Sequence, residues 1–123
     1  MPVIKQTITD SEYAIMCILW RTEKSMTVSD VVQALDGNDW TASTVSTFLQ
    51  RLLKKGIIAC DKKGKTNLYY PLLKQTDYDL SETENFLDKI YNGSAKNLIA
   101  ALFESKKLSA EDVSDLKKMF ELE

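Results

Sequence analysis

The strongest constraint on the fold is a change of periodicity at Gly56. In residues 41–55, apolar side chains recur every three or four positions, which predicts an α-helix with one buried stripe. Beyond Gly56, residues 57–61 and 68–72 favour two short strands joined by a lysine-rich loop, 62–67. The stripe consists of Val45, Phe48, Leu49, Leu52 and Leu53. The sequence therefore predicts a helix followed directly by a β-hairpin.

The opposite side of helix 41–55 carries small hydroxyls, an amide and a cation, without the Glu/Lys pairs of an ordinary solvated helix. Its members are Ser43, Ser46, Thr47, Gln50 and Lys54. Such a face suits a helix in a DNA groove, where its first part contacts base edges and Arg51, Lys54 and Lys55 contact phosphates. Taken alone, the helix fits an ordinary amphipathic helix better, since cations at a C-terminus also offset the helix dipole.

The segments around this helix favour the DNA-binding interpretation. Residues 9–12 and 27–30 have the pattern of capping boxes, which predicts a buried first helix through 13–20 and a second helix ending before Gly37. Two helices joined by a short turn make a helix-turn-helix, and a basic hairpin directly behind it is a wing whose lysines would flank the DNA. The alternative is a plain hairpin with a solvated loop.

Charge is distributed unevenly along the chain. The whole sequence carries a net charge of −2, whereas residues 41–71 contain six basic side chains and only Asp61, a net of +5. A positive block in an acidic chain is typical of a localised phosphate-binding surface. The main alternative is a winged-helix protein-interaction module that binds no DNA. An exposed aromatic or aliphatic patch on residues 41–55 would favour it, whereas that face is hydroxyl and basic. A purely structural role leaves the basic block unexplained.

Composition excludes several other classes of protein. The 123 residues include no histidine and only two cysteines, Cys17 and Cys60, which lack metal-ligand spacing. With no nucleophile–base pair and no phosphate-cradling glycine loop, we expect no enzyme, metal site or cofactor. The longest apolar run, 14–20, is too short to cross a bilayer, and the first residues resemble no secretory signal. We therefore expect a cytoplasmic protein without direct membrane insertion.

Residues 74–123 predict three short helices whose apolar faces have few partners within so small a chain. A second copy is the natural cover, so we expect a homodimer, with a folded-back helical cap as the alternative. The division predicted is a winged-helix DNA-binding domain at 1–73 and a helical dimerisation domain at 74–123. The expected dimerisation residues are Phe86, Leu87, Ile90, Tyr91, Leu98, Leu102, Phe103, Val113, Leu116, Met119 and Phe120.

The expected fold class is thus mostly α with a small β-hairpin wing, an N-terminal winged helix-turn-helix followed by a C-terminal helical region. The run from Trp40 to Ile58, the segment 68–72 and the stretches 86–98 and 108–116 resemble the BlaI/MecI family of penicillinase and methicillin-resistance repressors. The similarity extends over about the whole chain. CopY, a copper-responsive relative, has a C-terminal cysteine cluster that this chain lacks, which disfavours copper sensing.

The resemblance implies a homodimeric repressor that binds an inverted-repeat DNA operator, controlling β-lactamase or related antibiotic-resistance genes in a pathway with a membrane sensor-transducer and protease. The residues expected to contact base edges are Ser43, Thr44, Ser46 and Thr47. The residues expected to contact phosphates are Thr41, Gln50, Arg51, Lys54, Lys55, Lys62, Lys63 and Lys65.

The chain departs from the family pattern at two places. Better-known members carry a cation at the positions of Ser43 and Ser46, so the operator sequence or the affinity for each half-site is expected to differ. Induction in those members proceeds by cleavage of an Asn-Phe bond, and the matching bond here is Ala101-Leu102. The resemblance makes that bond the candidate cleavage position without establishing proteolytic induction.

Overall fold

The computed structural model describes residues 8–35, 37 and 39–123. It contains six helices and one antiparallel hairpin among the described residues. In chain order the elements are α1 (Asp10–Arg21), α2 (Val28–Ala34), α3 (Ala42–Lys54), β1 (Ile58–Lys63), β2 (Thr66–Pro71), α4 (Gln75–Tyr91), α5 (Ala95–Glu104) and α6 (Ala110–Met119). The mostly helical fold with a small hairpin is the one that the sequence predicted.

The chain divides into two compact units, Met1–Asp79 and Leu80–Glu123. The predicted division fell after residue 73. The unit boundary lies later because α4 begins inside the first unit, where Tyr78 is buried. Its ring stands 5.8 Å from that of Tyr13 and 5.9 Å from that of Trp20, between centroids.

Local hydrogen bonds explain why the helices of the first unit begin where they do. Thr9 and Glu12 form a capping box at α1, and Thr27 and Asp30 form another at α2. Thr41 is the N-cap of α3. Each helix start depends on hydrogen bonds between residues three positions apart. A sequence pattern can therefore predict where the helix begins.

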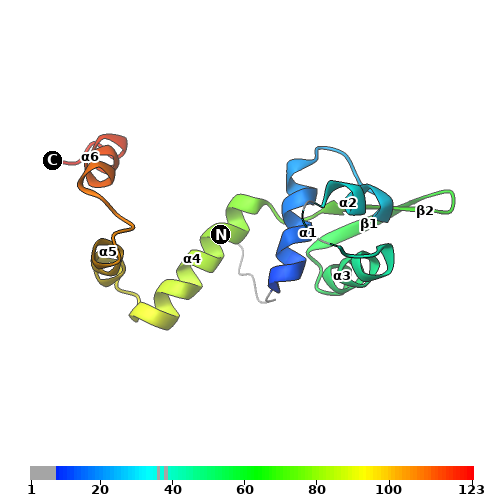
Figure 1. Cartoon of the computed structure of the whole chain (residues 1–123), viewed down its shortest axis with the longest axis horizontal. Helices are drawn as coiled ribbons and strands as arrows, with labels where there is room; N and C mark the ends of the chain where they lie inside the picture. The colour runs from blue at the N-terminus through cyan, green and yellow to red at the C-terminus, as the bar shows by residue number, and fades with distance from the viewer. Residues whose placement is uncertain (1–7, 36, 38) are drawn as a thin grey trace. The chain divides into compact units, whose positions relative to one another are not determined.

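The core of the first unit lies among the three helices and the hairpin. Side chains with no exposed area include Ile15 of α1, Val31 of α2 and Leu49 of α3, and Ile58 of β1 and Tyr69 of β2 are almost fully buried. The backbone of Tyr69 also exchanges two hydrogen bonds with that of Met26, of 2.9 and 2.7 Å. The hairpin is thereby joined to the segment before α2, and its far end extends past α2 and α3 (Figure 1).

The hairpin is longer than predicted. The strands extend over Ile58–Lys63 and Thr66–Pro71, so Lys62 and Lys63 lie in β1 and not in a six-residue loop. The turn consists of Gly64 and Lys65 alone. Gly64 has φ +65°, as glycine does at the first position of a two-residue hairpin turn. The prediction of a long loop was wrong because lysines are poor strand formers in isolation, whereas here strand pairing carries the backbone through them.

The second unit consists of the remainder of α4 with α5 and α6. Asn92 and Gly93 both have positive φ and end α4, after which Ser94 caps α5. A capping box of Ser109 and Asp112 begins α6. The three helices after residue 74 are the number that the sequence predicted.

Candidate nucleic-acid interface

The face of α3 opposite the core brings most of the predicted DNA-contacting residues together. Val45, Leu49 and Leu52 are fully buried on one side. On the other side Ser43, Thr47, Gln50, Arg51 and Lys54 are exposed, and Ser46 is half-buried. The helix thus presents hydroxyls in its first two turns and cations in its last, all on the side away from the core.

Three threonines, the N-cap and two residues of α3, form hydrogen bonds within this segment. The Thr41 hydroxyl accepts a hydrogen bond from the Thr44 backbone N–H and donates to the Thr44 hydroxyl, both at 3.2 Å. The Thr47 hydroxyl donates to the Ser43 carbonyl at 3.1 Å. The Thr47 hydroxyl proton is therefore used inside the helix, and its oxygen stays able to accept a hydrogen bond.

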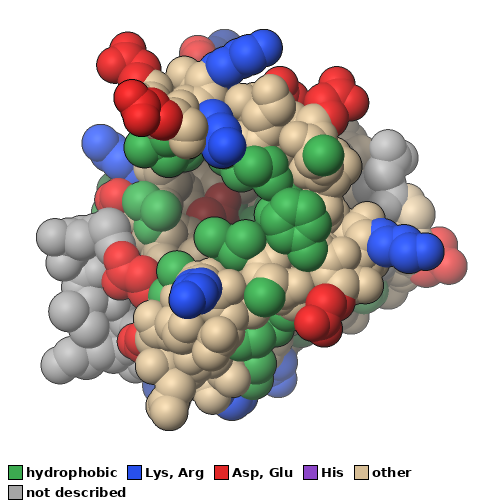
Figure 2. Space-filling view, turned by 90° about the vertical axis from the view of Figure 1, so that its left-hand side faces the viewer, with side chains coloured by type: hydrophobic (Ala, Val, Ile, Leu, Met, Phe, Trp, Pro, Cys, Tyr) green, Lys and Arg blue, Asp and Glu red, His purple; other side chains and the backbone are tan. Residues whose placement is uncertain are grey.

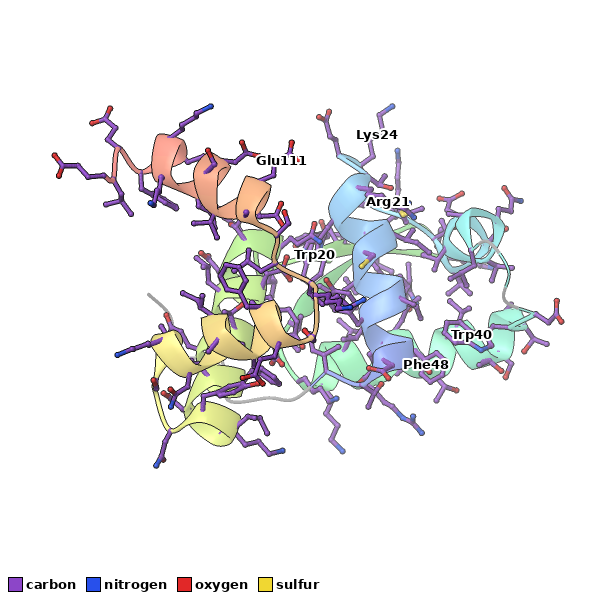
Figure 3. The ribbon with its side chains drawn as sticks, turned by 60° about the vertical axis from the view of Figure 1, so that its left-hand side comes forward. Trp20, Arg21, Lys24, Trp40, Phe48 and Glu111 are labelled. Carbon is purple, nitrogen blue, oxygen red and sulfur yellow. The ribbon has the colours of Figure 1, made fainter. Side chains whose placement is uncertain are left out.

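An aromatic pair supports the start of α3 and the cation at its far end. The rings of Trp40 and Phe48 meet edge to face with centroids 5.0 Å apart (Figure 3). The Arg51 guanidinium lies 5.8 Å from the Phe48 centroid, close enough for a cation–π interaction. This contact orients Arg51, and sequence analysis missed it because it placed Phe48 only in the core stripe.

Lys55 has a protein partner. Its Nζ lies 2.6 Å from Oε1 of Glu12, a residue of α1 that is fully buried. Burial raises the pKa of the Glu12 carboxyl, but hydrogen bonds from Lys55 and Thr9 outweigh that effect and bring the pKa below its ordinary value. The second oxygen, Oε2, is buried and accepts no hydrogen bond from the described residues. Lys55 therefore ties the end of α3 to the start of α1; its predicted phosphate contact stays a prediction.

The hairpin places its three lysines in the open. Lys62 pairs with Asn67 and Lys63 with Thr66, and these residues and Lys65 are all exposed. At the base of the hairpin, the hydroxyl of buried Tyr69 accepts a hydrogen bond of 3.3 Å from Nε2 of Gln50. The hairpin is therefore connected to the polar face of α3 by one side-chain contact that no sequence pattern indicated.

The second unit leaves its apolar side chains open. Neither α5 nor α6 contains a buried residue, and Phe120 and Met119 are 63% and 70% exposed. Figure 2 shows hydrophobic side chains open to solvent on the face that it draws. Of the predicted dimerisation residues, Leu87, Tyr91, Leu98 and Val113 are half-buried and the other seven are exposed. Leu80, Ile99 and Leu122 are further exposed apolar residues that the prediction left out.

The candidate cleavage bond lies inside a helix. Ala101 and Leu102 belong to α5, and their carbonyls accept hydrogen bonds of 3.0 and 2.9 Å from the N–H groups of Ser105 and Lys107. A helical backbone must open before a protease can bind it as an extended strand. Cleavage at this bond stays a prediction.

Two features are absent from the part of the chain that the structure describes. No three His, Cys, Asp or Glu side chains there lie close enough together to hold a metal ion. No helix there is both long and apolar enough to cross a membrane.

Comparisons with known proteins agree with this geometry. The penicillinase repressor family matches residues 8–121. The penicillinase repressor of Bacillus licheniformis is 30% identical over 115 residues, covering 93% of this chain and 89% of that protein. The methicillin resistance regulatory protein MecI of Staphylococcus aureus is 28% identical over 113 residues, covering 91% of each. The solved structure of B. licheniformis BlaI, a monomeric form in complex with the blaP half-operator, is similar with a TM-score of 0.51 and 31% identity, covering 59% of this chain and 89% of that one.

These findings confirm the resemblance predicted from the motifs, and with it the expectation of a repressor in place of an enzyme. They also identify α1–α3 and the hairpin as a winged helix. The chain therefore belongs to the penicillinase repressor family, the family of the DNA-binding repressors BlaI and MecI.

Proposed function

We propose that this chain is a cytoplasmic homodimer that represses transcription by binding an inverted-repeat operator of β-lactamase or related resistance genes. One observation carries the proposal: the exposed polar face of α3 lies beside a basic hairpin, in a chain of the penicillinase repressor family. Residues 1–73 would bind DNA and residues 74–123 would form the dimer. A membrane sensor-transducer acting through a protease is the proposed source of the inducing signal.

In the proposed complex, α3 enters the major groove. Ser43, Thr44, Ser46 and Thr47 face base edges, because they occupy the first turns of the helix. Arg51 and Lys54 reach the backbone at the other end, and the hairpin lysines flank the groove. The BlaI complex with its half-operator supports this arrangement, since that relative binds DNA with the same fold.

The dimer is proposed because α5 and α6 bury none of their own apolar side chains. Seven of the predicted residues are exposed in a unit where α5 and α6 bury nothing. A two-fold interface pairs the same surface of both copies, so the exposed apolar residues of one copy can cover those of the other. A two-fold dimer predicts half-sites centred about one helical turn, or a small multiple of it, apart.

A mobility-shift titration of the full chain against its own upstream region tests the proposal. With roughly 6–10 phosphate contacts per dimer, affinity is expected to fall about 10³- to 10⁵-fold between 50 and 200 mM salt. A Ser43→Ala/Thr47→Ala variant should lose its preference for the upstream region over competitor DNA. The control, Thr76→Ala/Ser114→Ala, removes two exposed hydroxyls away from α3 and should bind like the parent.

Each failure has a distinct meaning. Salt-sensitive binding that the Ser43/Thr47 variant retains in full would contradict base contact through α3. Absence of binding at both salt concentrations would contradict the repressor proposal and favour a protein-interaction module.

A further inference from the structure

Gln50 occupies the middle of the outward face of α3. It follows Ser43 by seven residues and Thr47 by three, so the three side chains lie along one line of the helix surface. Gln50 is exposed. Its place on the helix is therefore that of a residue facing base edges, whereas the sequence analysis assigned it to the phosphates.

The Gln50 amide is held from outside the helix. Its Nε2 donates to the hydroxyl of Tyr69 at 3.3 Å, and Tyr69 is only 1% exposed. The backbone of Tyr69 is fixed on both sides, by pairing with Cys60 in β1 and by two hydrogen bonds to Met26. A long, flexible side chain thus has its functional end attached to one of the most constrained residues of the unit.

The hydrogen bond to Tyr69 leaves part of the Gln50 amide available to bind a ligand. An amide nitrogen carries two hydrogens, so one remains for a ligand, together with both lone pairs of Oε1. The Thr47 proton is used on the Ser43 carbonyl, and the Thr41 hydroxyl donates to that of Thr44, which keeps its own proton. A hydroxyl carries its donor and its acceptors on one oxygen, whereas the Gln50 amide presents a donor and an acceptor on two neighbouring atoms.

That pair of groups matches adenine better than phosphate. In the major groove adenine presents an N7 acceptor beside an N6 donor, which a glutamine amide contacts with Nε2 and Oε1 together. A phosphate has only acceptors and would leave Oε1 unused. We propose that Gln50 is a further specificity-determining residue of α3 and contacts an adenine in each operator half-site, with Tyr69 as its positioning residue. This inference rests on the proposed operator binding.

The test selects half-sites from a duplex library with randomised base pairs, using the full chain and four variants. The parent should select an A·T pair at one position per half-site. Gln50→Ala should lose preference at that position, by about 10- to 100-fold, and keep its preferences elsewhere. Tyr69→Phe should favour the same base with weaker discrimination and unchanged affinity for random duplex.

Two variants sharpen the result. Gln50→Arg should shift the selected base from adenine to guanine, because a guanidinium donates to both guanine acceptors. Gln33→Ala removes an exposed amide from α2 and should leave every base preference unchanged. At the selected adenine, 7-deazaadenine removes only the N7 acceptor; it should weaken the parent about tenfold and leave Gln50→Ala unaffected.

The outcomes separate this inference from the function on which it rests. If the parent selects a defined half-site and Gln50→Ala selects the same bases, the adenine assignment is overturned and operator binding stands. A uniform loss of affinity in Gln50→Ala, with base preference retained, would return Gln50 to the phosphate contacts. If the parent selects no sequence over competitor, the proposed function itself fails.

Discussion

The two compact units differ in how completely each covers its own apolar side chains. The first unit buries residues from three helices and both strands, and even its buried carboxylate, Glu12, has a lysine partner. The second unit has helices with equally sound caps, yet α5 and α6 bury no residue. Capping therefore determines where helices begin and end in both units, whereas only the first has enough converging surfaces to form a core by itself.

The largest expected effect is a loss of stability of the first unit. Lys55→Met should lower its free energy of unfolding by about 3 kcal/mol, because Glu12 would keep a buried charge without its partner. Both tryptophans, Trp20 and Trp40, lie in this unit, so fluorescence during urea unfolding measures it selectively.

The neighbouring lysine provides the control. Lys54 is exposed, so Lys54→Met should leave stability within about 0.5 kcal/mol of the parent and instead weaken DNA binding. Equal losses of stability in the two variants would contradict a structural role specific to Lys55.

The second prediction concerns the open faces of the second unit. Phe103→Asp/Leu116→Asp should convert the proposed dimer to a monomer and lower affinity for a two-half-site operator by about 100-fold, since the second half-site contact is no longer intramolecular. Affinity for one half-site and tryptophan-detected unfolding should change little. Sedimentation equilibrium measures the assembly. Lys118→Asp, an exposed change on another side of α6, should remain dimeric.

A smaller effect depends on pH. Because the folded-state pKa of Glu12 lies below its ordinary value, the ion pair contributes stability above that ordinary pKa and loses it as pH falls through the folded pKa. Glu12→Gln should therefore be less stable than the parent at pH 7, and the difference should narrow toward pH 3. Urea titrations across this range measure it; a constant difference would contradict the linkage.

The smallest effect is at the junction of α3 and β1. Gly56 has φ +76°, and no atom lies within 4 Å of a Cβ added there, so Gly56→Ala should cost only backbone strain, about 1 kcal/mol. Gly56→Asn should cost less, because asparagine tolerates this conformation. Thermal unfolding of the parent and the two variants measures these differences in stability. A larger loss for asparagine than for alanine would show that space, not backbone conformation, limits the position.

Local features could be predicted from the sequence because their causes are local. The caps at Thr9, Thr27 and Ser109 depend on residues three positions apart, and the apolar stripe of α3 depends on its own period. The same reasoning located the hairpin and the polar face. It failed for Lys62 and Lys63, whose strand conformation depends on pairing with Asn67 and Thr66.

Pairings across the fold had no signal in the sequence. Glu12 and Lys55 are 43 residues apart, and Glu12 was recognised only as a capping residue. Gln50 and Tyr69 are 19 apart, on elements of different periodicity. Such contacts depend on how helices and strands pack, so the sequence indicated neither the Glu12–Lys55 ion pair nor the Gln50–Tyr69 hydrogen bond.

The open side chains of α5 and α6 also bear on how sharply repression responds to the amount of repressor. In the proposed dimer these faces are covered only by association, so the population able to hold both half-sites depends on the square of the monomer concentration. When monomers predominate, a tenfold dilution lowers dimer concentration by about 100-fold. Modest loss of protein, by growth or degradation, would then release the operator abruptly.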